Sequence, residues 1–243
     1  MRITFFGSGH GIPEPHKKCS SAMVEVGEHR YIIDMGTQVI EGLTDRRLPV
    51  KSVKAIFITH MHGDHTNGLL SFLDLCSWKY TEADPAVYLP EDTDRYARVI
   101  SEWISCNHVT MRPFRFFHVE AGCIYDDGML RVTAYRTKHL EYSYAYLLEA
   151  EGKRVLFSGD LSKQGPLEDF PTEVLDEGLD LAVCECAHFD ATKYLPIFEG
   201  RTNIGRICFN HFSNNKPNSA TTVGTDMPHI PVVAASDGMD LIV

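Results

Sequence analysis

Short apolar runs separated by turn residues dominate the first sixty positions of the chain. The runs "RITFF", "SAMVEV" and "HRYIIDMG" predict three strands, the last two joined by a tight turn at "GE". Residues 53–59, "VKAIFIT", form a continuous apolar run, which is typical of a strand buried on both faces. The N-terminal part of the chain therefore predicts a sheet with at least one interior strand.

Helical spacing appears in the next segment. The sequence "TNGLLSFLDLCSWKY" predicts an amphipathic helix that begins at Thr66 or Asn67 as N-cap. Its apolar positions are Leu69, Leu70, Phe72, Leu73 and Cys76. "AVYLP" then predicts a strand, and "EDTDRYARVISEWI" a second helix with acidic residues in its first turn.

The rest of the chain predicts further strands with few helices. "RFFHVE", "MLRVTAYRT", "YSYAYLLEA" and "KRVLFSG" predict strands, with a hairpin turn at "EGK" between the last two. "EVLDEG" predicts a helix, and "LDLAVCE", "RICFN", "IPVVAAS" and "MDLIV" predict strands. This order indicates an α/β protein with two packed sheets and helices outside them. No repeat or linker marks a boundary, so we expect residues 1–243 to form a single domain.

The densest chemistry lies in "ITHMHGDHTNG", residues 58–68. His60 and His62 alternate in an extended segment, so both side chains can point the same way. Gly63 permits a sharp turn, after which Asp64 and His65 can face a second point. One loop could thus contribute ligands to two metal ions.

Three further candidate ligands follow predicted strands: His139, Asp160 and His211. His139 would complete a three-histidine set with His60 and His62, like those that hold catalytic zinc. Asp160 has two carboxylate oxygens and could bridge the ions, while His211 would join Asp64 and His65. A single such residue is usually an ordinary loop residue, but the whole ordered series predicts a metal site.

Composition narrows the class of protein. The chain has 243 residues, a formal net charge of −10 and 44% hydrophobic residues. It lacks an apolar run of the roughly 20 residues that span a bilayer, and seven scattered cysteines favour reduced thiols. We therefore expect a cytoplasmic protein without a membrane partner. The acidity favours a small anionic substrate over a nucleic acid, because proteins that bind nucleic acid usually present a basic face to phosphates.

The motifs resemble those of a known superfamily. "THMHGDH", His139, "SGD" and "NHF" are similar to the five motifs of the metallo-β-lactamase superfamily. That resemblance implies a four-layer αβ/βα sandwich with a dinuclear metal site. The metal ligands that it implies are His60, His62, Asp64, His65, His139, Asp160 and His211. We expect two divalent ions, zinc in the first place, with manganese and iron as alternatives.

Within the superfamily, "HLEYSYAY", the opening "FFGSGHGIPEPHKKCSS" and the ending "AASDGMDLIV" resemble the RNase Z and cyclic-phosphodiesterase branch. Two features depart from the tRNA-maturing enzymes. Those enzymes insert a protruding arm between the third histidine and the bridging aspartate, whereas residues 140–159 are here accounted for by one hairpin. They also carry a His-Glu-Ala-Thr motif, where this chain reads "CECAHF" with Cys184 in place of the histidine.

The resulting hypothesis is a dinuclear metal-dependent hydrolase, most simply a phosphodiesterase of a small phosphodiester or nucleotide-type substrate. Asp64 would orient the attacking hydroxide. His188 could supply the acid that Cys184 cannot, or it could be a loop histidine without a catalytic role. Alternatives are hydrolysis of another ester, thioester or lactam, RNase Z-type processing of tRNA 3′ ends, and iron-based redox or sensing work. A homodimer stays an open alternative.

Overall fold

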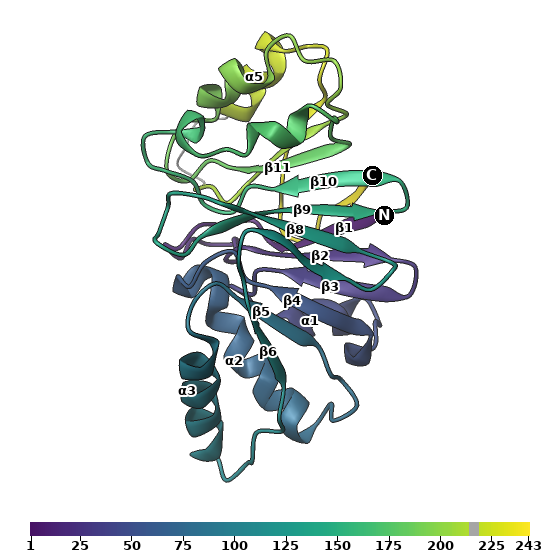
Figure 1. Ribbon diagram of the computed structural model, residues 1–243, viewed down its shortest axis with the longest axis vertical. Helices are drawn as coiled ribbons and strands as arrows, with labels where there is room; N and C mark the ends of the chain where they lie inside the picture. The colour runs from purple at the N-terminus through teal and green to yellow at the C-terminus, as the bar shows by residue number, and fades with distance from the viewer. Residues whose placement is uncertain (214–218) are drawn as a thin grey trace.

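Two seven-stranded β-sheets pack face to face, and helices cover their outer faces (Figure 1). The computed structural model describes residues 1–213 and 219–243. The strand order is β14-β1-β2-β3-β4-β5-β6 in the first sheet and β13-β12-β11-β10-β9-β8-β7 in the second. The prediction of an α/β sandwich with helices outside two packed sheets is confirmed.

The first sheet contains the first six strands of the chain and the last one, and the second sheet contains the seven strands between them. The first sheet contains β1 (Arg2–Gly7), β2 (Ser21–Val26), β3 (His29–Ile33), β4 (Val53–Phe57), β5 (Ala86–Leu89), β6 (Arg115–His118) and β14 (Asp240–Ile242). The second contains β7 (Gly122–Asp126), β8 (Arg131–Arg136), β9 (Tyr144–Ala150), β10 (Lys153–Phe157), β11 (Leu181–Glu185), β12 (Ile207–Asn210) and β13 (Val232–Ala234).

The helices divide between the two outer faces. Those of the N-terminal half are α1 (Val39–Asp45), η1 (Val50–Ser52), α2 (Gly63–Trp78) and α3 (Thr93–Ser105). Those of the C-terminal half are η2 (Pro166–Glu168), η3 (Thr172–Leu175), η4 (Ala191–Tyr194), α4 (Leu195–Phe198) and α5 (Ser219–Asp226). Among the described helices, none has the length and apolar character needed to cross a membrane.

Three apolar clusters hold these four layers together. The central cluster lies between the sheets and includes Phe57 of β4 and Tyr146 of β9. A second cluster, which contains Ile56 of β4 and Phe72 of α2, joins the first sheet to α1 and α2. A third cluster joins the second sheet to the helices of the C-terminal half. Phe57 and Ile56 are neighbours that point to opposite faces, so the prediction that this strand is buried on both sides is confirmed.

The parallel arrangement of the central strands places their carboxyl ends at a common edge. Strands β3 to β6 pair in parallel in the first sheet, and β10 to β13 pair in parallel in the second. The loops that leave β4, β10 and β12 therefore emerge where ligands collect in open α/β sheets.

The start of α2 differs from the prediction. The helix begins at Gly63, with His62 as an extended N-cap residue, and not after Thr66 or Asn67. The "GDHT" segment is thus the first helical turn, and Asp64 lies where a negative charge interacts favourably with the helix dipole.

Backbone contacts from the loop after β3 hold this first turn. The N–H of Met35 donates to the carbonyl of His65 at 2.7 Å, and the carbonyl of Met35 accepts from the N–H of Gly68 at 2.6 Å. A Cβ on Gly68 would overlap the Thr37 carbonyl oxygen, so glycine allows the close approach. These partners lie about thirty residues away, which is why local capping signals misplaced the helix start.

Three smaller differences have local causes. "EVLDEG" was expected to form a helix, but only the 3₁₀ turn η3 forms, and Gly178 takes a positive φ of 80° shortly after it. Helix α1 was missed because its short sequence contains a glycine and three β-branched residues, which weaken the helical signal. Strand β7 was missed because much of it is exposed and its apolar pattern is weak.

Two glycine substitutions should have opposite effects on stability. Gly68→Ala should destabilise the protein by at least about 2 kcal/mol, because the new methyl group meets backbone that cannot move aside. Gly224→Ala, in α5, should stabilise it by about 0.5–1 kcal/mol, because the new Cβ would lie 3.4 Å from the nearest Val232 atom. Chemical denaturation of both variants tests this, and equal effects would contradict the close packing of the α2 start.

Candidate metal centre

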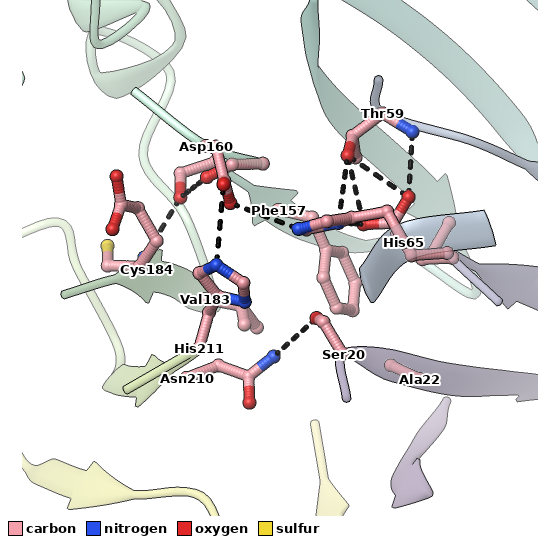
Figure 2. Close-up of a pocket in the computed structure, with 15 residues that line it drawn as sticks. Ser20, Ala22, Thr59, His65, Phe157, Asp160, Val183, Cys184, Asn210 and His211 are labelled. Atoms are coloured by element: carbon pink, nitrogen blue, oxygen red, sulfur yellow. Dashed lines mark hydrogen bonds and ion pairs between the residues drawn. The ribbon is translucent and has the colours of Figure 1, made fainter. Parts of the chain in front are cut away.

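The seven predicted ligands come together at the edge where the central strands end. His60 and His62 follow β4, Asp160 follows β10 and His211 follows β12. His139 lies in the turn between β8 and β9, and the first turn of α2 provides Asp64 and His65. Figure 2 shows the side chains of Asp160, His65 and His211 facing one another from different elements.

These side chains form two compact groups. Within each group, the potential ligand atoms lie within 4.8 Å of one another. One group contains His60, His62, His139 and Asp160, and the other contains Asp64, His65 and His211. The structure thus brings together the two sets of residues proposed from the sequence, and Asp160, expected between them, falls in the group with the three histidines.

Asp160 contacts both groups. Its Oδ2 lies 3.6 Å from His60 Nε2 and 3.7 Å from His139 Nε2 on one side. On the other side, Oδ2 lies 3.3 Å from His211 Nε2, and Oδ1 lies 3.4 Å from His65 Nε2. The carboxylate is 3% exposed, so it is a buried charge surrounded by imidazoles.

The donor atoms fit a bound cation. His65 Nε2 and Asp160 Oδ1 are buried and have no hydrogen-bond partner among the described residues, although they lie 3.4 Å apart. Buried polar atoms are normally satisfied, so an orphaned nitrogen and oxygen facing each other need an explanation. Imidazole nitrogens and carboxylate oxygens are ligands of zinc and related divalent ions, and a cation among them would satisfy both atoms.

The electrostatics agree with this fit. Burial holds the pKa of His60 well below its ordinary value and also lowers the pKa of His139. Both imidazoles are therefore neutral near pH 7, which is the form that binds metal. Burial alone would raise the pKa of Asp160, but His211 and His65 outweigh it and hold that pKa well below the usual range.

His65 shows that the second group favours positive charge. Burial lowers its pKa, yet the negative charges of Asp160 and Asp34 outweigh burial and hold the pKa well above the ordinary value. Carboxylates that attract a proton to an imidazole nitrogen would equally attract a metal ion to it.

Asp34 has a role that the sequence interpretation missed. Its Oδ2 accepts a hydrogen bond from His65 Nδ1 at 2.7 Å, which leaves His65 Nε2 facing the centre. Its Oδ1 accepts the N–H of Thr59 at 2.8 Å. A carboxylate behind a ligating histidine fixes the ring and its tautomer. The available signal was position: Asp34 directly follows the "YII" end of β3, much as Asp160 follows "LFSG".

His188 lies beside the centre, in contact with a second buried carboxylate. Its Nδ1 is 2.9 Å from Glu185 Oε1, and its Nε2 is 3.9 Å from Asp160 Oδ2. Burial lowers the pKa of His188, but the hydrogen bond and charge of Glu185 outweigh it and raise that pKa. His188 is therefore more readily protonated than a free histidine, with Nε2 turned toward the metal-binding groups.

The "CECAHF" segment thus divides its residues between the core and the site. Cys184 is fully buried, and burial raises the pKa of its thiol well above the ordinary value. Glu185 also accepts the backbone N–H groups of Leu161 at 3.0 Å and Ala187 at 2.8 Å, which joins β11 to the loop after Asp160. Glu185 was part of the recognised motif, but its contact with His188 was not foreseen.

Comparisons with known proteins identify the family. Residues 1–177 match the family model described as Anti-Pycsar protein Apyc1. The chain is 31% identical over 175 residues to Ribonuclease Z of Brevibacillus brevis, an alignment that covers 70% of this chain and 54% of the relative. The chain spans about half the length of such curated relatives.

Two solved structures share the fold over nearly the whole chain. The metallo-β-lactamase fold protein YhfI from Bacillus subtilis superposes with a TM-score of 0.80 at 17% identity, covering 99% of both chains. The short form of human tRNase Z gives 0.77 at 19% identity, covering 100% of this chain and 99% of that one. The predicted superfamily and its RNase Z-like branch are confirmed. The chain has the metallo-β-lactamase fold and belongs to the Anti-Pycsar protein Apyc1 family.

Proposed function

We propose that this chain is a dinuclear metal-dependent phosphodiesterase that hydrolyses a small phosphodiester or nucleotide-type substrate. The observation that carries the proposal is the position of Asp160 between two groups of ligand atoms. A buried carboxylate shared by two such groups is suited to hold two ions close enough to act on one phosphate.

In this proposal, each ion has its own ligands. His60, His62 and His139 would hold the first ion, Asp64, His65 and His211 would hold the second, and Asp160, which contacts both groups, would be shared by the two. Zinc is the first choice, because three-histidine sets are typical of catalytic zinc, with manganese and iron as alternatives. Bound divalent ions would supply Lewis acidity, lowering the pKa of a water molecule and neutralising charge on phosphoryl oxygens.

The protein's own groups would orient the reactants. Asp64 Oδ2 lies 3.6 Å from His65 Nε2 and 3.7 Å from His211 Nε2, at the edge of the second group. Its carboxylate could accept a hydrogen bond from the attacking water and so direct a lone pair toward phosphorus. We propose Asp64 as a catalytic residue in addition to its role as a ligand.

His188 is proposed as the general acid. Glu185 holds Nδ1, so Nε2 is the atom available to give a proton to the leaving oxygen. The raised pKa keeps a larger protonated fraction near neutral pH, which a general acid requires. Leaving groups that are strong bases depend most on this proton.

The preference for a small substrate rests on the hairpin and the charge. Residues between His139 and Asp160 form the β9–β10 hairpin, where the resemblance to tRNA-maturing enzymes would place an arm. The net charge of −10 disfavours a long polyanion. We further propose that residues 1–243 act as one domain in the cytoplasm.

A second candidate function is processing of tRNA 3′ ends, because relatives at 31% identity are named Ribonuclease Z. This function would require a protein surface that binds the body of a tRNA, as the protruding arm does in the tRNA-maturing enzymes. The two functions differ in the substrate that is hydrolysed and in how strongly substrate binding depends on salt concentration, so an assay can separate them.

Substrate size is tested by comparing bis-(p-nitrophenyl) phosphate and a 2′,3′-cyclic nucleotide with a precursor tRNA. We expect turnover of the small diesters with weak salt dependence, because one phosphate reaches the centre and few distant contacts contribute. The precursor tRNA should keep its 3′ trailer at physiological salt. Asp160→Ala should be inactive throughout, which controls for contaminating nucleases. Efficient trailer removal by the wild-type protein would favour the second candidate.

The role of His188 predicts a dependence on the leaving group. His188→Ala should lower turnover of a 2′,3′-cyclic nucleotide by about 10²–10⁴-fold, because a ribose oxygen leaves poorly without a proton. Turnover of bis-(p-nitrophenyl) phosphate should change little, since p-nitrophenolate is a stable anion.

His229→Ala, at an exposed histidine that contacts the carbonyl of Arg201, is the matched control and should leave both rates unchanged. Metal content should stay the same in both variants. An equal loss on the two substrates would argue against proton transfer from His188.

A further inference from the structure

The side chain of Asp169 connects two loops that carry proposed ligands. Its Oδ2 accepts the N–H of Lys138 at 2.6 Å, the residue directly before His139. The same carboxylate accepts the N–H of Ser162 at 3.2 Å through Oδ1 and 3.1 Å through Oδ2. Ser162 lies two residues after Asp160. The Asp169 carboxylate therefore binds backbone close to two members of the first ligand group, His139 and Asp160.

Two neutral hydrogen bonds accompany this contact. The Thr137 hydroxyl donates to the carbonyl of Asp160 at 3.1 Å, and His139 Nδ1 lies 3.3 Å from the carbonyl of Leu161. The Leu161 contact turns His139 Nε2 toward the centre. Hydrogen bonds to an ionised acceptor are roughly twice as strong as neutral ones, so Asp169 makes the strongest of these connections.

The two ligand groups do not depend equally on this connection. His60 and His62 come from the first sheet, whereas His139 comes from the second. The distances from His139 to His60 and His62 therefore depend on the position of the loop at residues 137–143. Asp64, His65 and His211 lie on other segments, away from the loop backbone that Asp169 binds.

We propose that Asp169 is a positioning residue for His139 and thereby sets the affinity of the first metal ion. The inference rests on the proposed function in taking His139 as a ligand of that ion. Residues behind a metal ligand commonly change metal affinity by 10–100-fold when they are replaced. Here the effect should fall mainly on the first ion. Among the proposed ligands of the second ion, only Asp160 lies near backbone that Asp169 binds, whereas Asp64, His65 and His211 lie on other segments.

The test measures zinc affinity directly. Apoprotein is titrated with zinc in competition with a chromophoric chelator, which resolves two dissociation constants. His139→Ala identifies which constant belongs to the first ion. Asp169→Ala should weaken that constant by about 10–100-fold. Asp169→Asn should weaken it less, because one amide oxygen can still accept. The second constant should stay within about threefold of wild type in both variants.

Asp180 offers a matched control on the same sheet. Its carboxylate accepts the N–H of Arg154 at 2.9 Å and the ammonium group of Lys153 at 2.8 Å, at the opposite ends of β10 and β11. Asp180→Asn removes a comparable charged acceptor far from the ligand loops. It should leave both zinc constants unchanged, even if it lowers the melting temperature of the apoprotein.

The outcomes separate this inference from the proposed function. Unchanged affinity in both Asp169 variants, or equal weakening of both ions, would overturn the positioning role. A wild-type protein that binds two zinc ions but hydrolyses no phosphodiester would overturn the proposed activity. In that case, comparing the zinc dissociation constants of the wild-type protein and the Asp169 variants would still decide the role of Asp169. Wild-type binding of fewer than two ions would overturn the dinuclear assignment and the inference with it.

Discussion

Burial of the Asp160 carboxylate among histidines is the interaction on which the site depends. A buried charge is costly unless opposite charge or hydrogen bonds compensate it. The compensation comes from imidazoles that the two sheets deliver from separate strand ends, so it exists only when the sheets are correctly packed. The central apolar core between the sheets therefore supports the site, because it sets the spacing of candidate ligands that belong to different sheets.

Two further buried carboxylates, farther from the centre, each contact the imidazole of one histidine. Asp34 is 4% exposed and holds His65, while Glu185 is 3% exposed and holds His188. Each also accepts backbone N–H groups, which satisfies its remaining oxygen and fixes its position. A histidine in this arrangement can present only one nitrogen to the centre. The result is a preorganised set of donor atoms that requires little rearrangement to act.

The sequence was informative where chemistry is local and less so where it depends on distant contacts. The candidate ligands of "HMHGDH" could be recognised because the loop carries them at short spacing, and the remaining three candidates follow strand ends. The beginning of α2 was misplaced because backbone contacts with Met35, far along the chain, stabilise its first turn. Asp34 follows a strand end, but its contact with His65 could not be foreseen, and neither could the contact of Asp169 with Lys138, because the two residues of each pair lie 31 positions apart.

Anomalous X-ray scattering from crystals of the zinc-loaded protein tests the central claim most directly. The account predicts two peaks at the zinc edge, one on each side of the Asp160 carboxylate. One peak should be contacted by His60, His62 and His139. The other should be contacted by the ligands of the second group, Asp64, His65 and His211. A single peak, or peaks that Asp160 does not contact, would contradict a shared dinuclear centre.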